Sequence, residues 1–394
     1  MGDGAGRRFD AAAVVEARDG RRFRGRARER GAAERRRADR RQGRTVSFLS
    51  LERVEKRYPD GTHAVRGIDL SIERGEFVVL LGPSGCGKTT TLRMIAGLER
   101  HSAGTIHIDG RDVSGLAPSQ RDIGFVFQFY ALYPHLSVRE NVAFPLMCAA
   151  VAKADRERRV REVAASVGIE ALLERKPREL SGGDQQRVSL ARAMVREPAA
   201  WLMDEPLGTL DAGQRAGMVE FLRARQREAG VTTVYVTHDQ EEALRLADRV
   251  VVMDQGRIEQ CGPPARVYAE PATLFVARFV GSPGMNLVAG DCAGGRFMVA
   301  GARIADDVRA PDGPLVLGLR PEHVRVDPRG VLRGRCRLDA FHGACRYAWV
   351  DTPGTRIALR VSAAAPALAA AEVALGFDAA HACWFDPASG RRVA

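Results

Sequence analysis

One short stretch limits the possible folds of this chain more than any other feature. Gly82-Pro83-Ser84-Gly85-Cys86-Gly87-Lys88-Thr89 matches the pattern G-x-x-x-x-G-K-[ST]. The apolar run Phe77 to Leu81 precedes it and is typical of a strand buried on both faces. A segment with Leu92, Met94 and Ile95 follows and predicts a short helix. The order strand, glycine loop and helix predicts an α/β fold.

The loop is suited to phosphate. A helix that begins after it leaves backbone N–H groups unpaired at its positive end, where they attract an anion. Lys88 is placed to reach the β- and γ-phosphates of a nucleotide, and the Thr89 hydroxyl is placed to bind Mg²⁺. A glycine turn with a solvated lysine is the alternative interpretation, and motifs further along the chain weigh against it.

The net charge of +11 is concentrated at one end of the chain. Residues 1–45 contain 15 Arg and no Lys and carry +8, whereas the remainder carries +3. This leading segment offers little apolar surface to bury and is expected to be disordered. A solvated tail, a translation start assigned too early, and an arm for nucleic acid or anionic lipid are the alternatives for it.

Two absences narrow the function classes. No stretch contains eighteen consecutive apolar residues, so no helix is expected to span a bilayer and any membrane role is peripheral. The seven Cys show no C-x-x-C spacing, which argues against structural zinc and favours reduced thiols.

The residues before the loop predict antiparallel strands. Polar and apolar residues alternate over 49–54 and 64–72, with a turn at Pro59-Asp60-Gly61 between them. Tyr58 lies at this turn, where its ring either packs on an edge strand or stacks on adenine. After the loop, residues 104–110 predict another short strand and turn.

The segment from Ile123 to Gln128 predicts a strand that ends in an amide. The carbonyl oxygen of Gln128 is suited to Mg²⁺, and its amide is suited to positioning water. Three aromatic residues, Phe129, Tyr130 and Tyr133, follow closely. If exposed, they form an apolar patch of the kind that meets a partner.

A charged helical pattern over 152–178 is followed in the chain by a second candidate anion site. Ser181, Gly182 and Gly183 open a predicted helix that continues to Met194. A serine hydroxyl and glycines that permit close approach suit this helix N-terminus to an anion. A simple capping turn is the alternative.

Two further predicted strands end in polar residues. The apolar run from Trp201 leads to Asp204 and Glu205, which would point in opposite directions on a strand. Asp204 would then face the Mg²⁺ shell, and Glu205 the water that attacks the γ-phosphate. The strand predicted from Val231 ends at His238, and ligands bind at such strand ends in open α/β sheets.

The order of these motifs resembles that of the ATP-binding-cassette ATPase family over roughly residues 47–280. The resemblance implies a P-loop core sheet with an antiparallel β subdomain and a helical subdomain, and hydrolysis of ATP with Mg²⁺. In this family two cassettes meet head to tail with two-fold symmetry. Each ATP then lies between the phosphate loop of one chain and the Ser-Gly-Gly helix of the other.

The resemblance also implies residue roles. Glu205 would be the general base, His238 would contact the γ-phosphate, and Tyr58 would stack on adenine. The Mg²⁺ ligands would be Thr89, Gln128 and Asp204. The other nucleotide contacts would come from the loop residues Gly82, Pro83, Ser84, Gly85, Cys86, Gly87, Lys88, Thr89 and Thr90, and in trans from Ser181, Gly182 and Gly183, with Asp211 near the interface.

Two residues depart from the family pattern. Asp184 stands where the family usually has Gln, and Gly208 stands where it often has Ser. An extra carboxylate near the γ-phosphate bound by the partner is expected to weaken ATP affinity or dimer closure modestly. Gly208 is expected to loosen the contact across the dimer. Neither departure removes a predicted catalytic group.

The rest of the chain indicates a subfamily and a second domain. Residues 254–260 and 266–286 resemble the import ATPases of the maltose and glycerol-phosphate type, in which this helix leads to a regulatory domain. Short alternating segments from Leu287 onward fit a small OB-like β-barrel. We therefore expect an Arg-rich extension over 1–45, an ABC ATPase domain over 46–283 and an OB-like, TOBE-type regulatory domain over 284–394.

Together these features predict the ATPase subunit of a bacterial importer, on the cytoplasmic side of the membrane, for a sugar, polyol or glycerol-type solute. The expected partners are a second copy or a related ATPase, membrane permease subunits and an external solute-binding protein, with no nucleic acid. Polyamine, sulfate or iron are the alternative solutes. A soluble cassette ATPase acting on nucleic acid or ribosomes is a rival, although this chain has one cassette and no long coiled coil. A protein-binding regulator is another, although Glu205 and His238 are intact.

Overall fold

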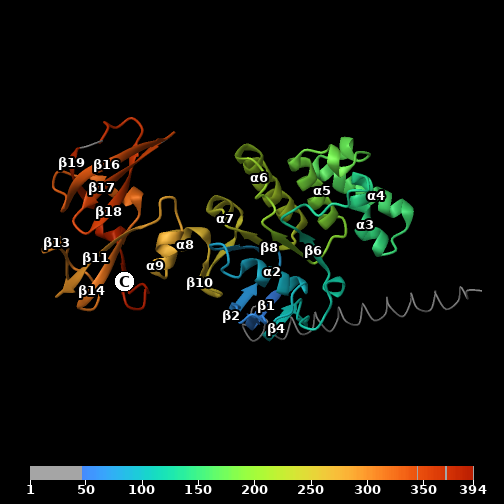
Figure 1. Cartoon of the computed structure of the whole chain (residues 1–394), viewed down its shortest axis with the longest axis horizontal. Coiled ribbons are helices and arrows are strands. Elements are labelled where there is room, and N and C mark those ends of the chain that lie inside the picture. Colours follow the sequence, from blue (N-terminus) through green and yellow to red (C-terminus); the bar gives the residue numbers. More distant parts are fainter. Residues whose placement is uncertain (1–46, 344, 369–370, 394) are drawn as a thin grey trace, which may run out of the picture.

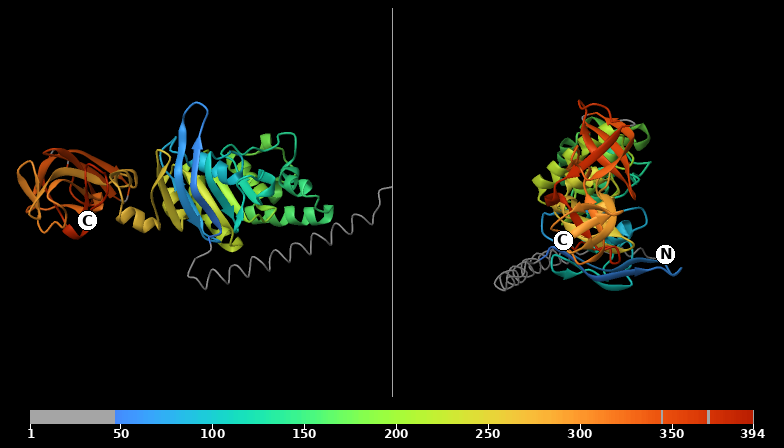
Figure 2. Two further views of the ribbon diagram at one scale, coloured as in Figure 1. Left: turned by 90° about the horizontal axis from the view of Figure 1, so that it is seen from below. Right: turned by 90° about the vertical axis from the view of Figure 1, so that its left-hand side faces the viewer.

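The computed structural model describes residues 47–343, 345–368 and 371–393, so the predictions for residues 1–45 lie outside it. The described strands form four sheets. Figures 1 and 2 show the two sheets formed by β1 to β10, together with most of the helices, as one body. The two sheets formed by β11 to β20 lie beside it. Helices α8 (Pro264–Ala269) and α9 (Leu274–Phe279) lie between the two parts.

The central sheet has the strand order β10-β9-β3-β8-β7-β6. All neighbouring pairs in it are parallel except β10 with β9. Strands β3, β7 and β8 are buried along their whole length, as expected of a parallel sheet that is covered on both faces. The strands are β3 (Phe77–Leu81), β6 (Ile123–Val126), β7 (Ala200–Asp204), β8 (Thr232–Thr237), β9 (Arg249–Asp254) and β10 (Arg257–Gly262).

Helices cover the two faces of this sheet. Helix α2 (Lys88–Ala96) shares a core with Val78 and Leu80 of β3. Helices α6 (Ala212–Ala229) and α7 (Gln240–Leu246) contribute to the core on the other face, with Val79 and Leu81. The carboxyl ends of the parallel strands therefore meet at one edge, where the loops after β3, β6, β7 and β8 carry the predicted site residues.

Two smaller units complete the cassette. The predicted antiparallel strands are confirmed as the sheet β2-β1-β4-β5, with bounds His63–Ile72, Leu49–Arg57, Ala103–Ile108 and Arg111–Asp112. Helices α3 (Val138–Cys148), α4 (Lys153–Val167) and α5 (Gly182–Met194) share a separate apolar core. The helical pattern predicted over 152–178 stops early because Gly168 adopts a left-handed φ of 70° after α4. Short 3₁₀ turns lie at Pro118–Gln120, Glu170–Leu172 and Pro177–Glu179.

The C-terminal part consists of two five-stranded antiparallel sheets around one apolar core, in agreement with the short strands predicted there. Their strand orders are β13-β12-β11-β14-β20 and β15-β19-β16-β17-β18. The first sheet contains β11 (Asn286–Ala293), β12 (Arg296–Val299), β13 (Ala302–Ala305), β14 (Gly313–Leu319) and β20 (Cys383–Phe385). The second contains β15 (Val324–Val326), β16 (Leu332–His342), β17 (Cys345–Thr352), β18 (Thr355–Ser362) and β19 (Glu372–Phe377). Two 3₁₀ turns lie at Pro321–His323 and Ala379–His381.

Arg320, directly after β14, attaches this part to α8 and α9. Its side chain is 1% exposed and donates hydrogen bonds to the carbonyl oxygens of Tyr268, Ala277 and Val280. Where one helix was expected over 266–286, the chain forms two, because Pro271 lies between them. In the described part of the chain, no helix combines the length and apolar character needed to cross a bilayer.

Candidate nucleotide-binding site

The phosphate loop follows β3 and is held by close backbone packing. A Cβ at Gly82 would lie 2.3 Å from the carbonyl oxygen of Met253, and one at Gly87 would lie 2.5 Å from that of Ala64. Gly87 also has a left-handed φ of 101° at the start of α2. Both positions therefore require glycine for steric reasons. Ser84 and Gly85 at the tip of the loop are exposed.

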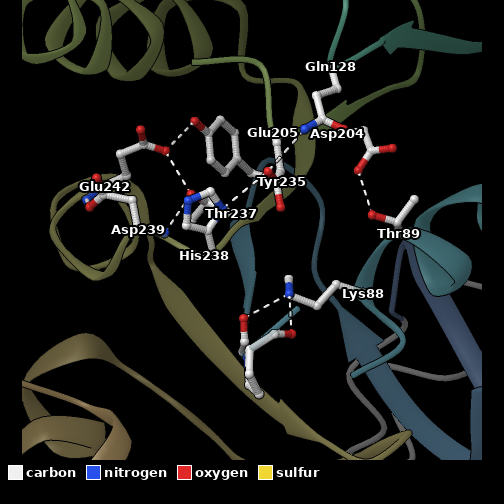
Figure 3. A network of polar contacts seen from close by, with 12 residues as sticks. Lys88, Thr89, Gln128, Asp204, Glu205, Tyr235, Thr237, His238, Asp239 and Glu242 are labelled. Carbon is white, nitrogen blue, oxygen red and sulfur yellow. Dashed lines mark hydrogen bonds and ion pairs between the residues drawn. The ribbon is translucent and has the colours of Figure 1, made fainter. Parts of the chain in front are cut away.

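Lys88 lies inside this loop. The whole residue is 5% exposed, and its ammonium group donates to the carbonyl oxygens of Gly82 at 2.8 Å and Pro83 at 2.9 Å (Figure 3). The thiol of Cys86 lies 3.7 Å from the same ammonium, and burial raises the pKa of this thiol. The loop therefore encloses a buried cation, with the thiol directed inward beside it.

Thr89 and Asp204 lie together beside the loop. The Thr89 hydroxyl donates to Asp204 Oδ1 at 2.9 Å, and a guanidinium nitrogen of Arg93 lies 3.7 Å from the other carboxylate oxygen. Burial raises the pKa of Asp204, while the bond from Thr89 and the charge of Arg93 oppose this shift. A hydroxyl and a carboxylate side by side are oxygen donors of the type that Mg²⁺ prefers. The donor set thus fits the predicted ion.

Glu205, Gln128 and His238 form a second cluster at the same sheet edge. His238 Nδ1 lies 3.2 Å and Gln128 Nε2 lies 3.4 Å from Glu205 Oε2, as Figure 3 shows. The Glu205 side chain is 19% exposed and that of His238 is 60% exposed. One carboxylate oxygen is therefore flanked by two groups that polarise or orient it, and the cluster remains open to solvent.

The expected alternation of Asp204 and Glu205 along one strand is wrong. Strand β7 ends at Asp204, and Glu205 lies beyond it with a left-handed φ of 44°. Its N–H donates to the carbonyl oxygen of Val236 at the end of β8. The tight turn, and not the strand pleat, sets the direction of the Glu205 side chain.

A buried network behind His238 was missed by the sequence reasoning. Glu242 on α7 accepts hydrogen bonds from Tyr235 at 2.7 Å and Thr237 at 3.0 Å. Burial raises the pKa of Glu242, and the two bonds oppose that shift. Asp239 caps α7 by accepting from the N–H groups of Glu241 and Glu242. The spacing of Tyr235 and Thr237 on one strand face was the available signal, and the network fixes the turn that carries His238.

The remaining predicted residues lie in other elements. Tyr58 follows β1, and the Lys56 ammonium lies 4.6 Å from the centre of its ring. Ser181 is the N-cap of α5 and Asp211 is the N-cap of α6. Among the described residues, no hydrogen bond or ion pair joins Ser181, Gly182 or Gly183 to Lys88 or Thr89. One chain therefore brings together the residues after β3, β6, β7 and β8, but, over the part that the structure describes, the Ser-Gly-Gly turn makes no such bond to the Lys88 and Thr89 of the same chain.

Comparison with known proteins agrees with this architecture. A family model described as ABC transporter matches residues 65–208, and one described as TOBE domain matches residues 317–385. The structure of cbiO1 from Clostridium perfringens, part of the ABC transporter complex cbiONQ, is 32% identical with a TM-score of 0.54 over 57% of this chain and 92% of that one. A dimeric post-hydrolysis structure of the ATP-binding cassette MJ0796, bound to ADP and Pi, is 34% identical with a TM-score of 0.51 over 55% and 98%.

Full-length relatives show the family. The sn-glycerol-3-phosphate import ATP-binding protein UgpC of Paracoccus denitrificans is 47% identical, covering 88% of this chain and 99% of that protein. The protein of the same name from Chromohalobacter salexigens is 46% identical, covering 88% and 96%. The chain therefore belongs to the ABC transporter family, among its import ATP-binding proteins, and is an ATPase.

Proposed function

We propose that the residues at the carboxyl edge of the central sheet bind ATP and Mg²⁺ and activate the attacking water. The loop from Gly82 to Thr90, with Lys88, would hold the phosphates, and Tyr58 would stack on the adenine. Mg²⁺, held by Thr89, Asp204 and Gln128, would neutralise the developing phosphate charge. Glu205 would accept the proton of the attacking water, and His238 would contact the γ-phosphate. The single observation that carries this assignment is the shared position of Gln128 and His238 within 3.4 Å of one Glu205 oxygen.

The complete site needs two chains. Ser181, Gly182 and Gly183 of one copy would close over the nucleotide held by Lys88 of another, with Asp211 near the interface. The lack of bonds between these residues and the phosphate loop of the same chain, among the residues that the structure describes, supports this, as does the dimeric state of the related cassette structure MJ0796. An arrangement with two-fold symmetry would form two such sites. Nucleotide would then stabilise the dimer by mass action.

The division into domains follows the apolar cores. We assign residues 46–283 to the ATPase domain and 284–394 to an OB-like regulatory domain, with residues 1–45 as an extension without an assigned role. The C-terminal sheets have a core of their own, distinct from those of the cassette. Arg320 and a small cluster around Ala277 and Phe385 connect the two domains.

The chain would act at the cytoplasmic face of the membrane with permease subunits and an external solute-binding protein. Phe129 is 73% exposed and Tyr133 is 36% exposed, and both lie in the loop after β6, which supports a docking surface there. The solute would be sn-glycerol-3-phosphate or a related sugar or polyol, because the relatives that match nearly the whole chain carry that name. The nearly neutral charge of residues 46–394 gives little support for nucleic acid.

The Glu205→Gln variant tests the catalytic assignment. It keeps the size of the side chain but removes the base, so it should bind ATP, lose ATP turnover and accumulate as a dimer with ATP and Mg²⁺. Turnover and molecular mass by light scattering are the measurements, and Glu170→Gln on an exposed turn is the matched control. Substantial residual turnover would show that Glu205 is not the base. Loss of glycerol-3-phosphate uptake in cells lacking the chain, restored by wild type only, tests the solute.

A further inference from the structure

We propose that Tyr130 is a positioning residue that fixes the loop carrying Gln128 to the turn that follows Glu205. The Tyr130 hydroxyl lies 2.7 Å from the Thr209 hydroxyl. Gln128 precedes Tyr130 by two residues, and Glu205 precedes Thr209 by four. The same two loops are therefore joined twice, by the Gln128–Glu205 contact at 3.4 Å and by the shorter Tyr130–Thr209 hydrogen bond. This inference rests on the proposed roles of Gln128 and Glu205.

The backbone of Tyr130 is anchored to α5, so only its side chain depends on Thr209. Its carbonyl oxygen accepts from the Ser189 hydroxyl at 3.0 Å and from Arg192 at 2.9 Å. Arg192 also donates to the carbonyl oxygen of Ala131 at 2.6 Å. Helix α5 packs beside β6, and these bonds hold the loop after β6 against the helix.

The turn that carries Thr209 transmits its position to Glu205. Gly208 donates its N–H to the carbonyl oxygen of Glu205 at 3.2 Å, and Leu210 donates to that of Leu207 at 3.1 Å. The turn ends at Asp211, the N-cap of α6. Because successive hydrogen bonds leave this short segment few conformations, a shift of Thr209 moves Glu205 with it.

Tyr130 also contacts the Ser-Gly-Gly turn. A Cβ at Gly182 would lie 3.0 Å from the Tyr130 hydroxyl, so the phenol occupies the space next to that glycine. One side chain thus borders three segments: the loop after β6, the turn after Glu205 and the first turn of α5. It is placed to keep the water-positioning group and the proposed base in register.

The Tyr130→Phe variant removes only the hydroxyl. Net loss of one hydrogen bond predicts that kcat falls about five-fold, with the KM for ATP unchanged, because the phosphate loop makes none of these contacts. Thr209→Val should lower kcat to the same degree. Thr209→Ser, which keeps a hydroxyl, should have the kcat of the wild type. The double variant should be no slower than either single variant, since both remove the same bond.

Tyr347→Phe is the matched control, because it removes a phenolic hydroxyl from β17 in the C-terminal sheets, away from Thr209. All variants are measured as full-length protein, with thermal unfolding followed to confirm that they fold. Wild-type kcat in Tyr130→Phe, independent effects of the two substitutions, or a raised KM with unchanged kcat would each overturn the inference. Failure of the proposed function itself would appear separately, as turnover by Glu205→Gln.

Discussion

Asp184 offers a quantitative test of how the Ser-Gly-Gly turn engages nucleotide. The Ser181 hydroxyl donates to Asp184 Oδ2 at 2.7 Å and accepts from the Asp184 N–H at 3.2 Å. If the Ser181 hydroxyl donates to the γ-phosphate held by the partner chain, it must first give up its hydrogen bond to the Asp184 carboxylate. The negative charge of Asp184 then also lies near the phosphate. Asp184→Asn keeps the size of the side chain and removes the charge.

The size of the effect follows from these contacts. A hydrogen bond to a charged acceptor is worth about 1 kcal/mol more than one to a neutral acceptor. The Asp184 side chain is 26% exposed and Arg187 lies 3.3 Å from it, so solvent and this cation screen its repulsion of the phosphate, and the expected effect is about 1 kcal/mol for each site. Two sites in a symmetric dimer give about 2 kcal/mol, which is about a 30-fold tighter dimer at saturating ATP.

The assay is analytical ultracentrifugation with ATP and Mg²⁺ in the Glu205→Gln background, where turnover does not interfere. The dimer dissociation constant should fall about 30-fold in Asp184→Asn and remain unchanged in Glu170→Gln, which removes a charge from the exposed turn at Glu170–Leu172. An equal or weaker dimer in Asp184→Asn would refute the reasoning, because the hydroxyl would then not be competing between the carboxylate and the phosphate.

Two further predictions concern stability. Arg320→Met should cost about 3 kcal/mol, since the carbonyl oxygens of Tyr268 and Val280 lose their donor and that of Ala277 loses one of two. Exposed Arg325→Met should cost under about 0.5 kcal/mol; urea unfolding compares the two variants, and equal losses would contradict the attachment role. Burial alone would raise the pKa of Asp248, but hydrogen bonds from Arg223 and the Phe77 N–H outweigh it and lower that pKa. Its stabilisation is therefore complete above the ordinary value and is lost as the pH falls through the lowered pKa. Asp248→Asn should flatten the fall in unfolding free energy below about pH 4, and an unchanged slope in acid titrations of stability would contradict this.

The sequence predicted the parts of the fold that local pattern controls. The apolar run in β3, the glycines of the loop and the strands before Gln128 and His238 each carry a local signal, and the structure has these elements in place. The strands end earlier than expected, β6 at Val126 and β8 at Thr237, so that Gln128 and His238 lie in the loops that follow. The strand order was not predictable in the same way. Strand β3 lies between β8 and β9, both of which are far from β3 in the chain. Only tertiary packing decides that placement.

The direction of Glu205 shows why part of the site could not be predicted. Asp204 and Glu205 read as a strand end, yet the N–H of Glu205 bonds to Val236 and its backbone becomes left-handed. Such a conformation is unfavourable for a non-glycine residue and persists because neighbouring contacts impose it. The Tyr235–Glu242 bond likewise joins a strand to a helix across a turn. The spacing of Tyr235 and Thr237 indicates a shared strand face, but no local pattern identifies Glu242 as their partner or predicts the Glu205–Val236 bond.

The engaged ammonium of Lys88 has a consequence for selectivity. Two carbonyl oxygens already satisfy this cation, so a ligand gains from displacing them only if it offers the ammonium more negative charge than neutral carbonyls do. A nucleoside without phosphates brings no such charge, and each added phosphate brings more. In the proposed site the loop would therefore distinguish ligands chiefly by the charge of their phosphate chain, and recognition of the base would be left to residues elsewhere in the chain.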